Sequence, residues 1–386
     1  EVLQSHGFVD RIVKRESMRK TLWFLLSSLK GNGEGAAGKN AGNAGNQDVS
    51  QEPAEKENGA GDSAEAGAHT GVGAALAGRQ AGSSEHTFDG EEKGAGESMG
   101  QESRQRKVSG KQGQEPGQSL GAAMTAWERV CAARSLTRPA SLDYIQKICS
   151  VFMELRGDRY FGDDRAVIGG IAAMEGRYVM MIGQQKGRSM AENKHRNFGM
   201  PSPEGYRKAL RLMKLAEKFR LPVVLFVDTP GAFCGVEAEE RGQGEAIARN
   251  LFEMAGLTVP VLSIVIGEGG SGGALGMAVA NQVWMLENAV YSILSPEGFA
   301  AILWKDGKRV QEAAEVMRMT AGELKEMGVI ERIIPEAQAA DRENMDELAD
   351  TMKTRILRFL EEWGEKSPQE ICDQRYERFR RIADGR

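Results

Sequence analysis

The central part of the chain alternates helical and fully apolar patterns. Residues 203–219 have a helical period and are followed by the apolar run VVLFVD, the loop TPGAFCG, a helical pattern over 239–255 and a second apolar run, VLSIVIG. Strands that are apolar throughout and alternate with helices are typical of a parallel sheet covered on both faces. We therefore expect an α/β fold in which the two strands lie in one sheet.

Regular structure is predicted on both sides of this region. A helix should begin near Thr125, and Ser141 should cap a second helix that buries Leu142, Ile145 and Ile148. Strands are expected at 167–171 and 178–183, joined by a turn at Glu175-Gly176. The tail, 343–383, reads as two helices broken near Ser367-Pro368.

The first 30 residues predict an amphipathic helix. Its apolar face is formed by Met18, Leu22, Leu25, Leu26 and Leu29. Thirty residues make a poor core alone. The segment is expected to dock on something absent or distant, and the alternative is a surface helix.

Residues 31–124 are predicted to be a disordered linker. Between 31 and 120 there are 20 glycines and only seven large apolar residues. This stretch also has 8 Lys/Arg against 14 Asp/Glu, a net charge of −6, whereas the whole chain has −5. It cannot bury enough apolar surface to offset the entropy of ordering. The rest of the chain is therefore near neutral, with no sign of a nucleic-acid surface. Residues 125–386 form the predicted folded domain.

The glycine-rich stretch 263–276, SIVIGEGGSGGALG, is the strongest candidate for chemistry. The pattern predicts a buried strand, a turn of bare backbone and a helix that extends to Ala280. Glycine lets a ligand approach the main chain, where N–H groups can face an oxygen anion. The loop Thr229-Pro230-Gly231-Ala232 follows the neighbouring strand, and ligands collect at such carboxyl ends. An oxyanion-binding pocket is expected where the two loops meet.

Two other motifs overlap these glycines, and a third is absent. Gly267-x-Gly269-x-x-Gly272 fits a dinucleotide-binding motif, with Glu287 as its ribose acid, and this alternative stays open. Gly269-x-Ser271-x-Gly273 fits a hydrolase nucleophile elbow, which needs a histidine downstream. That motif fails because every histidine precedes Ser271; they are His6, His69, His86 and His195. The phosphate-binding motif GxxxxGK[ST] is absent.

Other features have an ordinary structural reading. Lys186, Arg188, Lys194 and Arg196 form a positive stretch that could meet phosphates or a carboxylate, but a solvated face is the favoured interpretation. The acids Glu239 and Glu240 suit the N-terminus of a helix. The four cysteines have no CxxC spacing, which predicts neither a zinc site nor disulfides and favours a reducing, cytoplasmic location. No apolar run is long enough to span a bilayer.

The chain resembles the α subunit of the carboxyltransferase component of bacterial acetyl-CoA carboxylase. The resemblance covers residues 125–335 and includes GDRYFGDD, RNFGMPSPEGYRKALRLM, AEERGQGEAIARNLFEM and VIGEGGSGGALGMAV. It implies a crotonase-like spiral of ββα units with C-terminal helices. It also implies transfer of carboxylate from carboxybiotin to acetyl-CoA, giving malonyl-CoA for fatty acid synthesis. A non-catalytic assembly subunit of the same fold remains an alternative.

Residues 1–30 resemble the carboxyl end of the partner β subunit of that enzyme, which implies a fused β–α chain. The zinc ribbon of the β subunit would then lie upstream. The resemblance implies three partners: the β region, a biotin carboxyl carrier protein that brings carboxybiotin, and biotin carboxylase. The expected assembly is an oligomer of α–β units.

The resemblance also implies roles for particular residues. Backbone amides of Gly269 and Gly270 are expected to form the oxyanion hole, and those of Gly231 and Ala232 are weaker candidates. Substrate contacts are expected at Gly272, Gly273, Lys186 and Arg188, and no metal is expected in this chain.

This sequence departs from the family pattern in three places. It has Gly183-Gln184-Gln185-Lys186-Gly187 where the family usually has Gly-His-Gln-Lys-Gly. It also has Phe233-Cys234-Gly235 in place of Tyr-Pro-Gly, and AQAADRE after Pro335. These differences leave the fold expectation intact.

Overall fold

The structure, a computed structural model, describes residues 6–29 and 124–383. All of them belong to one compact unit. Apart from Met124, the predicted linker lies outside the described residues. The described part contains no helix long and apolar enough to cross a membrane.

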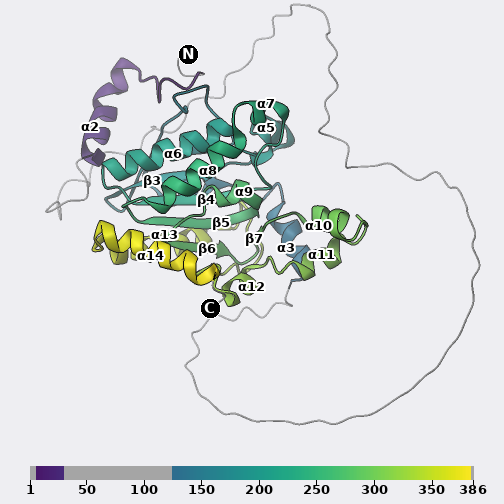
Figure 1. Cartoon of the computed structure of the whole chain (residues 1–386). Helices are drawn as coiled ribbons and strands as arrows, with labels where there is room; N and C mark the ends of the chain where they lie inside the picture. The colour runs from purple at the N-terminus through teal and green to yellow at the C-terminus, as the bar shows by residue number, and fades with distance from the viewer. Residues whose placement is uncertain (1–5, 30–123, 384–386) are drawn as a thin grey trace, which may run out of the picture. The chain divides into compact units, whose positions relative to one another are not determined.

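A mixed β-sheet forms the centre of this unit (Figure 1), which confirms the predicted α/β class. Its strand order is β1-β2-β3-β4-β5-β6-β8. Strand β7 lies outside this order and pairs with the last residues of β5, which follow the segment of β5 that pairs with β6. The antiparallel pairs are β1 with β2 and β2 with β3, and the other pairs are parallel. The strands are β1 Val151–Glu154, β2 Val167–Met174, β3 Arg177–Gln184, β4 Val223–Thr229, β5 Val261–Gly270, β6 Gln282–Leu286, β7 Val290–Ser292 and β8 Arg332–Ile334.

Helices connect and cover the strands. In chain order they are η1 Arg15–Ser17, α2 Met18–Leu29, α3 Ala126–Ala133, α4 Ser141–Ile148, α5 Met190–His195, η2 Asn197–Gly199, α6 Pro203–Lys218, α7 Val236–Glu240, α8 Gln243–Ala255, α9 Ser271–Leu275, α10 Pro296–Leu303, α11 Val310–Val316, α12 Ala321–Glu326, α13 Met345–Gly364 and α14 Pro368–Ala383. The predicted break in the tail and the predicted helix 203–219 are confirmed within a few residues.

The hairpin of β2 and β3 shows how the sheet is covered. Glu175 and Gly176 form its turn with φ values of 46° and 77°, as two-residue hairpin turns require. Gly169 pairs with Ile182, so Gly169 and Gly183 point to opposite faces. A Cβ at Gly169 would meet Leu212 of α6, and one at Gly183 would meet Ser141 of α4. Helices α6 and α4 therefore cover opposite faces, and β2-β3-α6 is a ββα unit of the kind expected.

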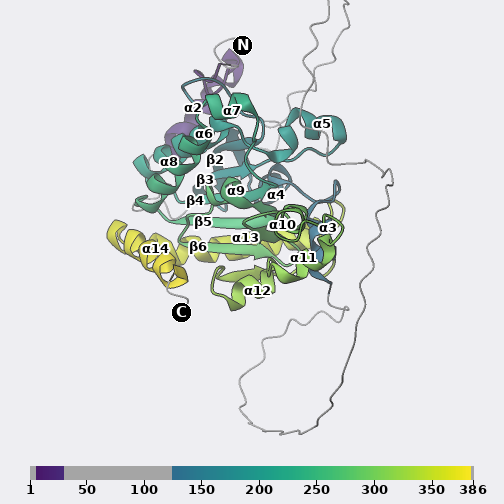
Figure 2. The same cartoon turned by 45° about the vertical axis from the view of Figure 1, so that its right-hand side comes forward.

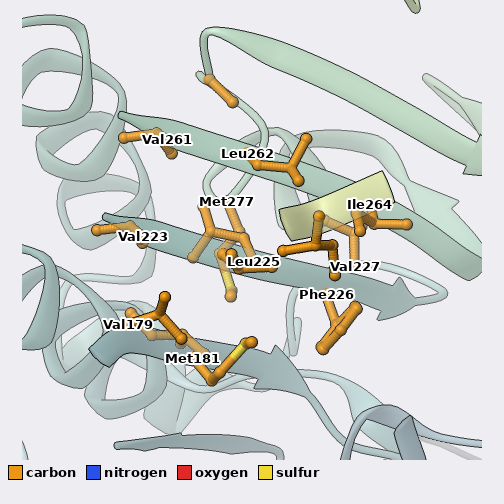
Figure 3. Packing of buried hydrophobic residues seen from close by; sticks show 14 of the residues in the cluster. Val179, Met181, Val223, Leu225, Phe226, Val227, Val261, Leu262, Ile264 and Met277 are labelled. Carbon is orange, nitrogen blue, oxygen red and sulfur yellow. The ribbon is translucent and has the colours of Figure 1, made fainter. Parts of the chain in front are cut away.

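Apolar residues of β3, β4 and β5 form the core between these layers. Figure 3 shows Val223 and Leu225 of β4 beside Val261 and Leu262 of β5, with Met277 packed against them. All five side chains have an exposed fraction of 0%. Burial of both faces explains why these strands are apolar throughout. Away from this core, α3, α10 and α11 lie side by side at one end of the sheet (Figure 2).

Three local predictions were wrong. Ser141 is the first residue of α4, and the N-cap is Ala140. The Ser141 Oγ does not cap the helix and donates to the carbonyl of Gln184 at 2.5 Å. The helix predicted over 239–255 is two helices, α7 and α8, separated at Gly242, whose φ is 82°. Glu239 and Glu240 consequently end α7 instead of opening a long helix.

The third correction concerns the glycine-rich stretch. Strand β5 continues through Gly270, so no turn separates it from the helix. The helix α9 begins at Ser271, which has a φ of 52°, and ends at Leu275 rather than near Ala280. The chain therefore changes from strand to helix at one residue.

The N-terminal segment packs on the same compact unit instead of on something absent or distant. The backbone N–H of Arg159 donates to the carbonyl of Gly7 at 3.3 Å, and Asp10 pairs with Arg159 and with Arg211, the latter at 2.9 Å. Phe24 of α2 is buried and meets Tyr178 edge to face, with ring centroids 5.6 Å apart.

The predicted helix α2 is confirmed, and its predicted buried face was right for Leu25 and Leu29 but wrong for the other three residues. The face that meets the core carries Phe24, Leu25 and Leu29. Met18, Leu22 and Leu26 are 45%, 50% and 64% exposed. Helical period alone cannot tell which of two apolar stripes finds a partner.

Helix α14 is attached to the core by Arg375, whose exposed fraction is 1%. Its guanidinium donates to the carbonyls of Met254, Leu257 and Val259 and to the Asn281 side chain, at 2.9, 2.7, 3.1 and 2.6 Å. The first of these carbonyls lies at the end of α8, where carbonyl groups lack helical partners. A cation at this helix end is favoured by the helix dipole.

We expect Arg375→Met to lower the free energy of unfolding by about 2–3 kcal/mol, because it leaves buried carbonyls without a donor. Urea unfolding followed by circular dichroism measures this effect. The matched control is Arg380→Met, since Arg380 is exposed and lies 3.9 Å from Glu377. The control should change stability by less than about 0.5 kcal/mol. Equal effects of the two substitutions would contradict the anchoring role of Arg375.

Candidate functional site

The carboxyl ends of β4 and β5 meet in direct contact. Thr229 pairs with Gly269 after a register shift in the ladder. A Cβ at Gly270 would lie 2.1 Å from the carbonyl oxygen of Pro230, and one at Gly273 would lie 2.4 Å from the nitrogen of Ala232. Only glycine permits this approach of two main chains. The predicted meeting of the two loops is therefore confirmed.

Two other glycines border open space. A Cβ at Gly231 would meet nothing within 4 Å, and one at Gly272 would touch only Ile247, at 4.0 Å. The N–H of Gly231 donates to Thr229 Oγ1 at 3.1 Å, so it would have to leave that acceptor to bind another oxygen. Gly269 is buried and Gly270 partly exposed, at the end of a strand between β4 and β7. We call residues 267–273 the glycine cluster. Its open side is bounded by Gly231, Gly270 and Gly272.

A buried group of charges lies beside this junction. Lys186 Nζ is 2.8 Å from Asp228 Oδ1 and 2.8 Å from Glu268 Oε2. Asp228 comes at the end of β4, and its Oδ1 also accepts the backbone N–H of Glu268 at 2.9 Å. Arg134 extends the group, since its guanidinium is 2.7 Å from Glu268 and 2.7 Å from Glu297.

The pKa values of these groups reflect burial and pairing. Burial raises the pKa of Asp228, and the Lys186 ammonium only partly opposes this effect. For Glu268, burial is outweighed by Lys186 and Arg134, which together hold its pKa below the usual range. Burial alone would lower the pKa of Lys186, but its two carboxylate partners raise it. Lys186 is therefore held as a cation by a carboxylate on each of two strands.

The prediction that the positive stretch of residues 186–196 forms a solvated face was wrong for Lys186. Its side chain is only 17% exposed and is paired as described. Arg188 pairs with Asp143 of α4, and Arg196 pairs with Glu192 of α5 at 3.0 Å. Lys194 is exposed. In this structure Lys186 and Arg188 are thus engaged by carboxylates of the same chain, and contact with a substrate stays a prediction.

Sequence reasoning missed Asp228, Glu268 and Arg134. Two signals could have found the acids: Asp228 ends the apolar run VVLFVD, and Glu268 interrupts the glycines of GEGG. A charged residue at the carboxyl end of a buried parallel strand is unusual unless it is paired or functional. Arg134 lies 134 residues before Glu268 and has no such local signal.

The dinucleotide-binding motif is not formed as that interpretation requires. Gly267 and Gly269 lie inside β5, so they do not make a tight turn before the helix. A Cβ at Gly267 would meet Asp228 Oδ1 at 2.3 Å, so the close neighbour is a carboxylate, which would repel a pyrophosphate. Glu287 accepts the backbone N–H of Glu336 at 3.0 Å. These placements correct the nicotinamide interpretation.

Within residues 6–29 and 124–383, no group of three or more His, Cys, Asp or Glu residues could hold a metal ion. His195, the last residue of α5, does not join the charged group at the junction of β4 and β5 and instead meets Arg165 at 2.9 Å. What this junction offers to a ligand is closely packed glycine backbone over a buried charged group. Such an arrangement suits the stabilisation of negative charge by fixed N–H dipoles.

Comparisons with known proteins agree on one family. The family model described as acetyl co-enzyme A carboxylase carboxyltransferase-like matches residues 92–383. The chain is 58% identical over 260 residues to the acetyl-coenzyme A carboxylase carboxyl transferase subunit alpha of Clostridium acetobutylicum, covering 67% of this chain and 95% of the relative. The corresponding protein of Bacillus cereus is 55% identical over 260 residues, with 67% and 80% covered.

Solved structures give weaker likenesses. Transcarboxylase 12S aligns with a TM-score of 0.49 at 20% identity, covering 59% of this chain and 42% of that structure. A single-chain, multi-domain long-chain acyl-CoA carboxylase aligns with a TM-score of 0.46 at 21% identity, covering 61% and 22%. A likeness of this size does not transfer residue roles. The match of the family model and the identity to the curated relatives show that this chain belongs to the acetyl co-enzyme A carboxylase carboxyltransferase-like family.

Proposed function

We propose that this chain is the α part of an acetyl-CoA carboxylase carboxyltransferase, which moves carboxylate from carboxybiotin to acetyl-CoA and gives malonyl-CoA. The identity of 58% to a relative named as that subunit supports the activity. The observation that carries the site is the junction of β4 and β5, where the glycine backbone of one strand end packs on the loop of the other.

The reaction needs stabilised negative charge more than an acid or a base. The bond between carboxylate and the biotin nitrogen breaks, a bond to the methyl carbon of acetyl-CoA forms, and the methyl proton passes to the freed biotin nitrogen. Charge develops on the ureido oxygen of biotin and on the thioester oxygen. Fixed N–H donors that face such oxygens lower the barrier, and losing one costs about 3 kcal/mol in other enzymes.

Residue roles follow from this chemistry. The N–H groups of Gly269 and Gly270 are proposed to serve the biotin oxygen. Those of Gly231 and Ala232 are weaker candidates, since Gly231 is bonded to Thr229. Gly272 and Gly273 are proposed to border the substrate. For Lys186 and Arg188 a role in binding CoA would require exchange of their present carboxylate partners.

The partners proposed are a carboxyltransferase β region, a biotin carboxyl carrier protein and biotin carboxylase, in an oligomer of α–β units. The resemblance of residues 1–30 to the end of a β subunit supports the first of these, with zinc held upstream in that β region. The packing of residues 6–29 on the α domain also supports a β partner, because a segment of this kind has a surface there to bind. The proposed location is the cytoplasm.

The decisive measurement is the reverse reaction, malonyl-CoA with free biotin, for this chain alone and with a β partner. We expect acetyl-CoA to form only with the partner, because the acyl-CoA pocket of the family is expected largely on the β side. Turnover by the chain alone would place that pocket in this chain. A folded complex without turnover would instead favour the assembly subunit.

A further inference from the structure

Gln184, at the end of β3, connects the loop after β4 to the glycine cluster that ends β5 and forms α9; these are called the two loops of the candidate site below. Its Oε1 accepts the backbone N–H of Asp228 at 3.1 Å, immediately before the loop that follows β4. Its Nε2 donates to the carbonyl of Gly273 at 2.8 Å, in the glycine cluster. We propose that Gln184 is a positioning residue for carboxyl transfer, which holds the two loops in the spacing that their N–H groups need. This inference rests on the proposed function.

The chemistry of the two partners determines how the Gln184 amide is oriented. A backbone N–H can only donate and a carbonyl can only accept, so the oxygen must face Asp228 and the nitrogen must face Gly273. The side chain has an exposed fraction of 0%, so water does not compete for either bond. Its own main-chain carbonyl accepts the hydroxyl of Ser141 at 2.5 Å, which ties this end of β3 to α4.

The carbonyl of Gly273 depends on side chains for its hydrogen bonds. At the end of the short helix α9, the N–H of Met277 bonds to Ala274 at 3.0 Å rather than to Gly273. The Gly273 carbonyl accepts the Tyr206 hydroxyl of α6, at 3.0 Å, together with the Gln184 amide. Tyr206 therefore reaches the glycine cluster only, whereas Gln184 reaches both loops.

This difference explains why Gln184 should affect the chemistry. Donors in an oxyanion hole work because they are already in place when charge develops. A misplacement of about 1 Å can lower a rate about 100-fold. Other ties between the two sides remain without Gln184, since Thr229 pairs with Gly269 and the Glu268 N–H bonds to Asp228. Loss of Gln184 removes the side-chain link between Gly273 and Asp228, so we expect the Gly273 part of the glycine cluster to shift relative to the loop after β4.

Two substitutions and one control test the inference, with the chain in complex with its β partner. Gln184→Met keeps the length of the side chain and removes both bonds. Gln185→Met is the matched control: Gln185 is also buried, but its Oε1 accepts from Leu142 at 2.8 Å and its Nε2 donates to Lys186 O at 2.8 Å, so it connects neither loop. We expect Gln184→Met to lower kcat about 10- to 100-fold with KM for malonyl-CoA nearly unchanged, because the effect is on the transition state. The control should keep kcat.

Gln184→Glu adds a readout that a purely structural role would not produce. A protonated glutamic acid can accept from Asp228 and donate to Gly273, as the glutamine does, whereas the carboxylate cannot donate. The ionisable groups around this position are Tyr206 of α6, Asp228 of β4 and Lys186 beyond β3, and all three have raised pKa values. We expect kcat of Gln184→Glu, divided by kcat of the unaltered chain at each pH, to rise as pH falls.

Hydrogen exchange of the same complexes separates this inference from the proposed function. In Gln184→Met, amides of residues 228–233 and 267–276 should exchange faster than in the unaltered chain, and in Gln185→Met they should not. If the unaltered complex does not transfer carboxylate, the proposed function fails, and exchange still decides whether Gln184 holds the loops. Unchanged exchange in Gln184→Met, or a kcat equal to that of Gln185→Met, would overturn the positioning role.

Discussion

Gly270→Ala is expected to lower kcat for carboxyl transfer by at least about 100-fold. The added methyl group would lie 2.1 Å from the carbonyl oxygen of Pro230 and 2.3 Å from its carbon, both main-chain atoms that cannot rotate away. The loop after β4 and the end of β5 must therefore separate. Since both loops supply the proposed N–H donors, the oxyanion hole would lose its spacing. Steady-state kinetics of malonyl-CoA with free biotin, in complex with the β partner, measures the loss.

The control for this substitution is Gly244→Ala in α8. A Cβ at Gly244 would meet nothing within 4 Å, and alanine is the better helix former. It should retain kcat. A more specific test replaces the peptide bond at the Gly270 nitrogen with an ester, which removes the N–H without adding a Cβ. If the ester keeps full turnover, the Gly270 N–H is not a donor, whatever the alanine does. Gly270→Pro would remove the N–H and add side-chain atoms at the same time, so it would not separate these two effects.

Lys186→Met is expected to lower the free energy of unfolding by about 3–5 kcal/mol at pH 7, because it leaves buried carboxylates without their shared cation. Asp228, 3% exposed, has Lys186 as its cationic partner, whereas Glu268 keeps Arg134. Denaturant unfolding at pH 7 measures the change. The double substitution Lys186→Met with Asp228→Asn should recover part of the loss, because the amide oxygen can still accept the N–H of Glu268.

The loss in Lys186→Met should also depend on pH. Burial already raises the pKa of Asp228, and removing the ammonium raises it further. An acid whose pKa is higher in the folded state binds more protons there, so its unfavourable contribution appears as pH rises and disappears as pH falls. The deficit relative to the unaltered chain should therefore shrink from pH 7 towards pH 5. Lys147→Met is the control, since Lys147 pairs with the exposed Asp346 and should matter by less than about 1 kcal/mol. Equal losses of stability in Lys186→Met and Lys147→Met would contradict the role of Lys186 as the shared cation of the buried carboxylates.

The local structure of the folded domain could largely be predicted from the sequence. The strands β4 and β5 and the helices α6, α13 and α14 follow from apolar runs, helical period and the Ser367-Pro368 break. These signals are local, because each depends on residues within one or two turns of each other. The meeting of the loop after β4 with the glycines at the end of β5 was also predictable, since adjacent parallel strands end at the same edge of a sheet. Family membership was evident from long matching stretches around the glycines.

Only the tertiary structure decided what the glycines and charges at that edge contact. Positions 270 and 273 require glycine because the main chain of another loop packs against them, and that loop lies about forty residues earlier in the sequence. Lys186, Asp228, Glu268 and Arg134 come from four separate parts of the chain and become one group only when β3, β4 and β5 lie in register. The same is true of α2, whose period predicted an apolar face but not which side would meet the core. Sequence determines local patterns by short-range sterics and burial, whereas the partners of a buried charge or a bare backbone are chosen by the packing of distant segments.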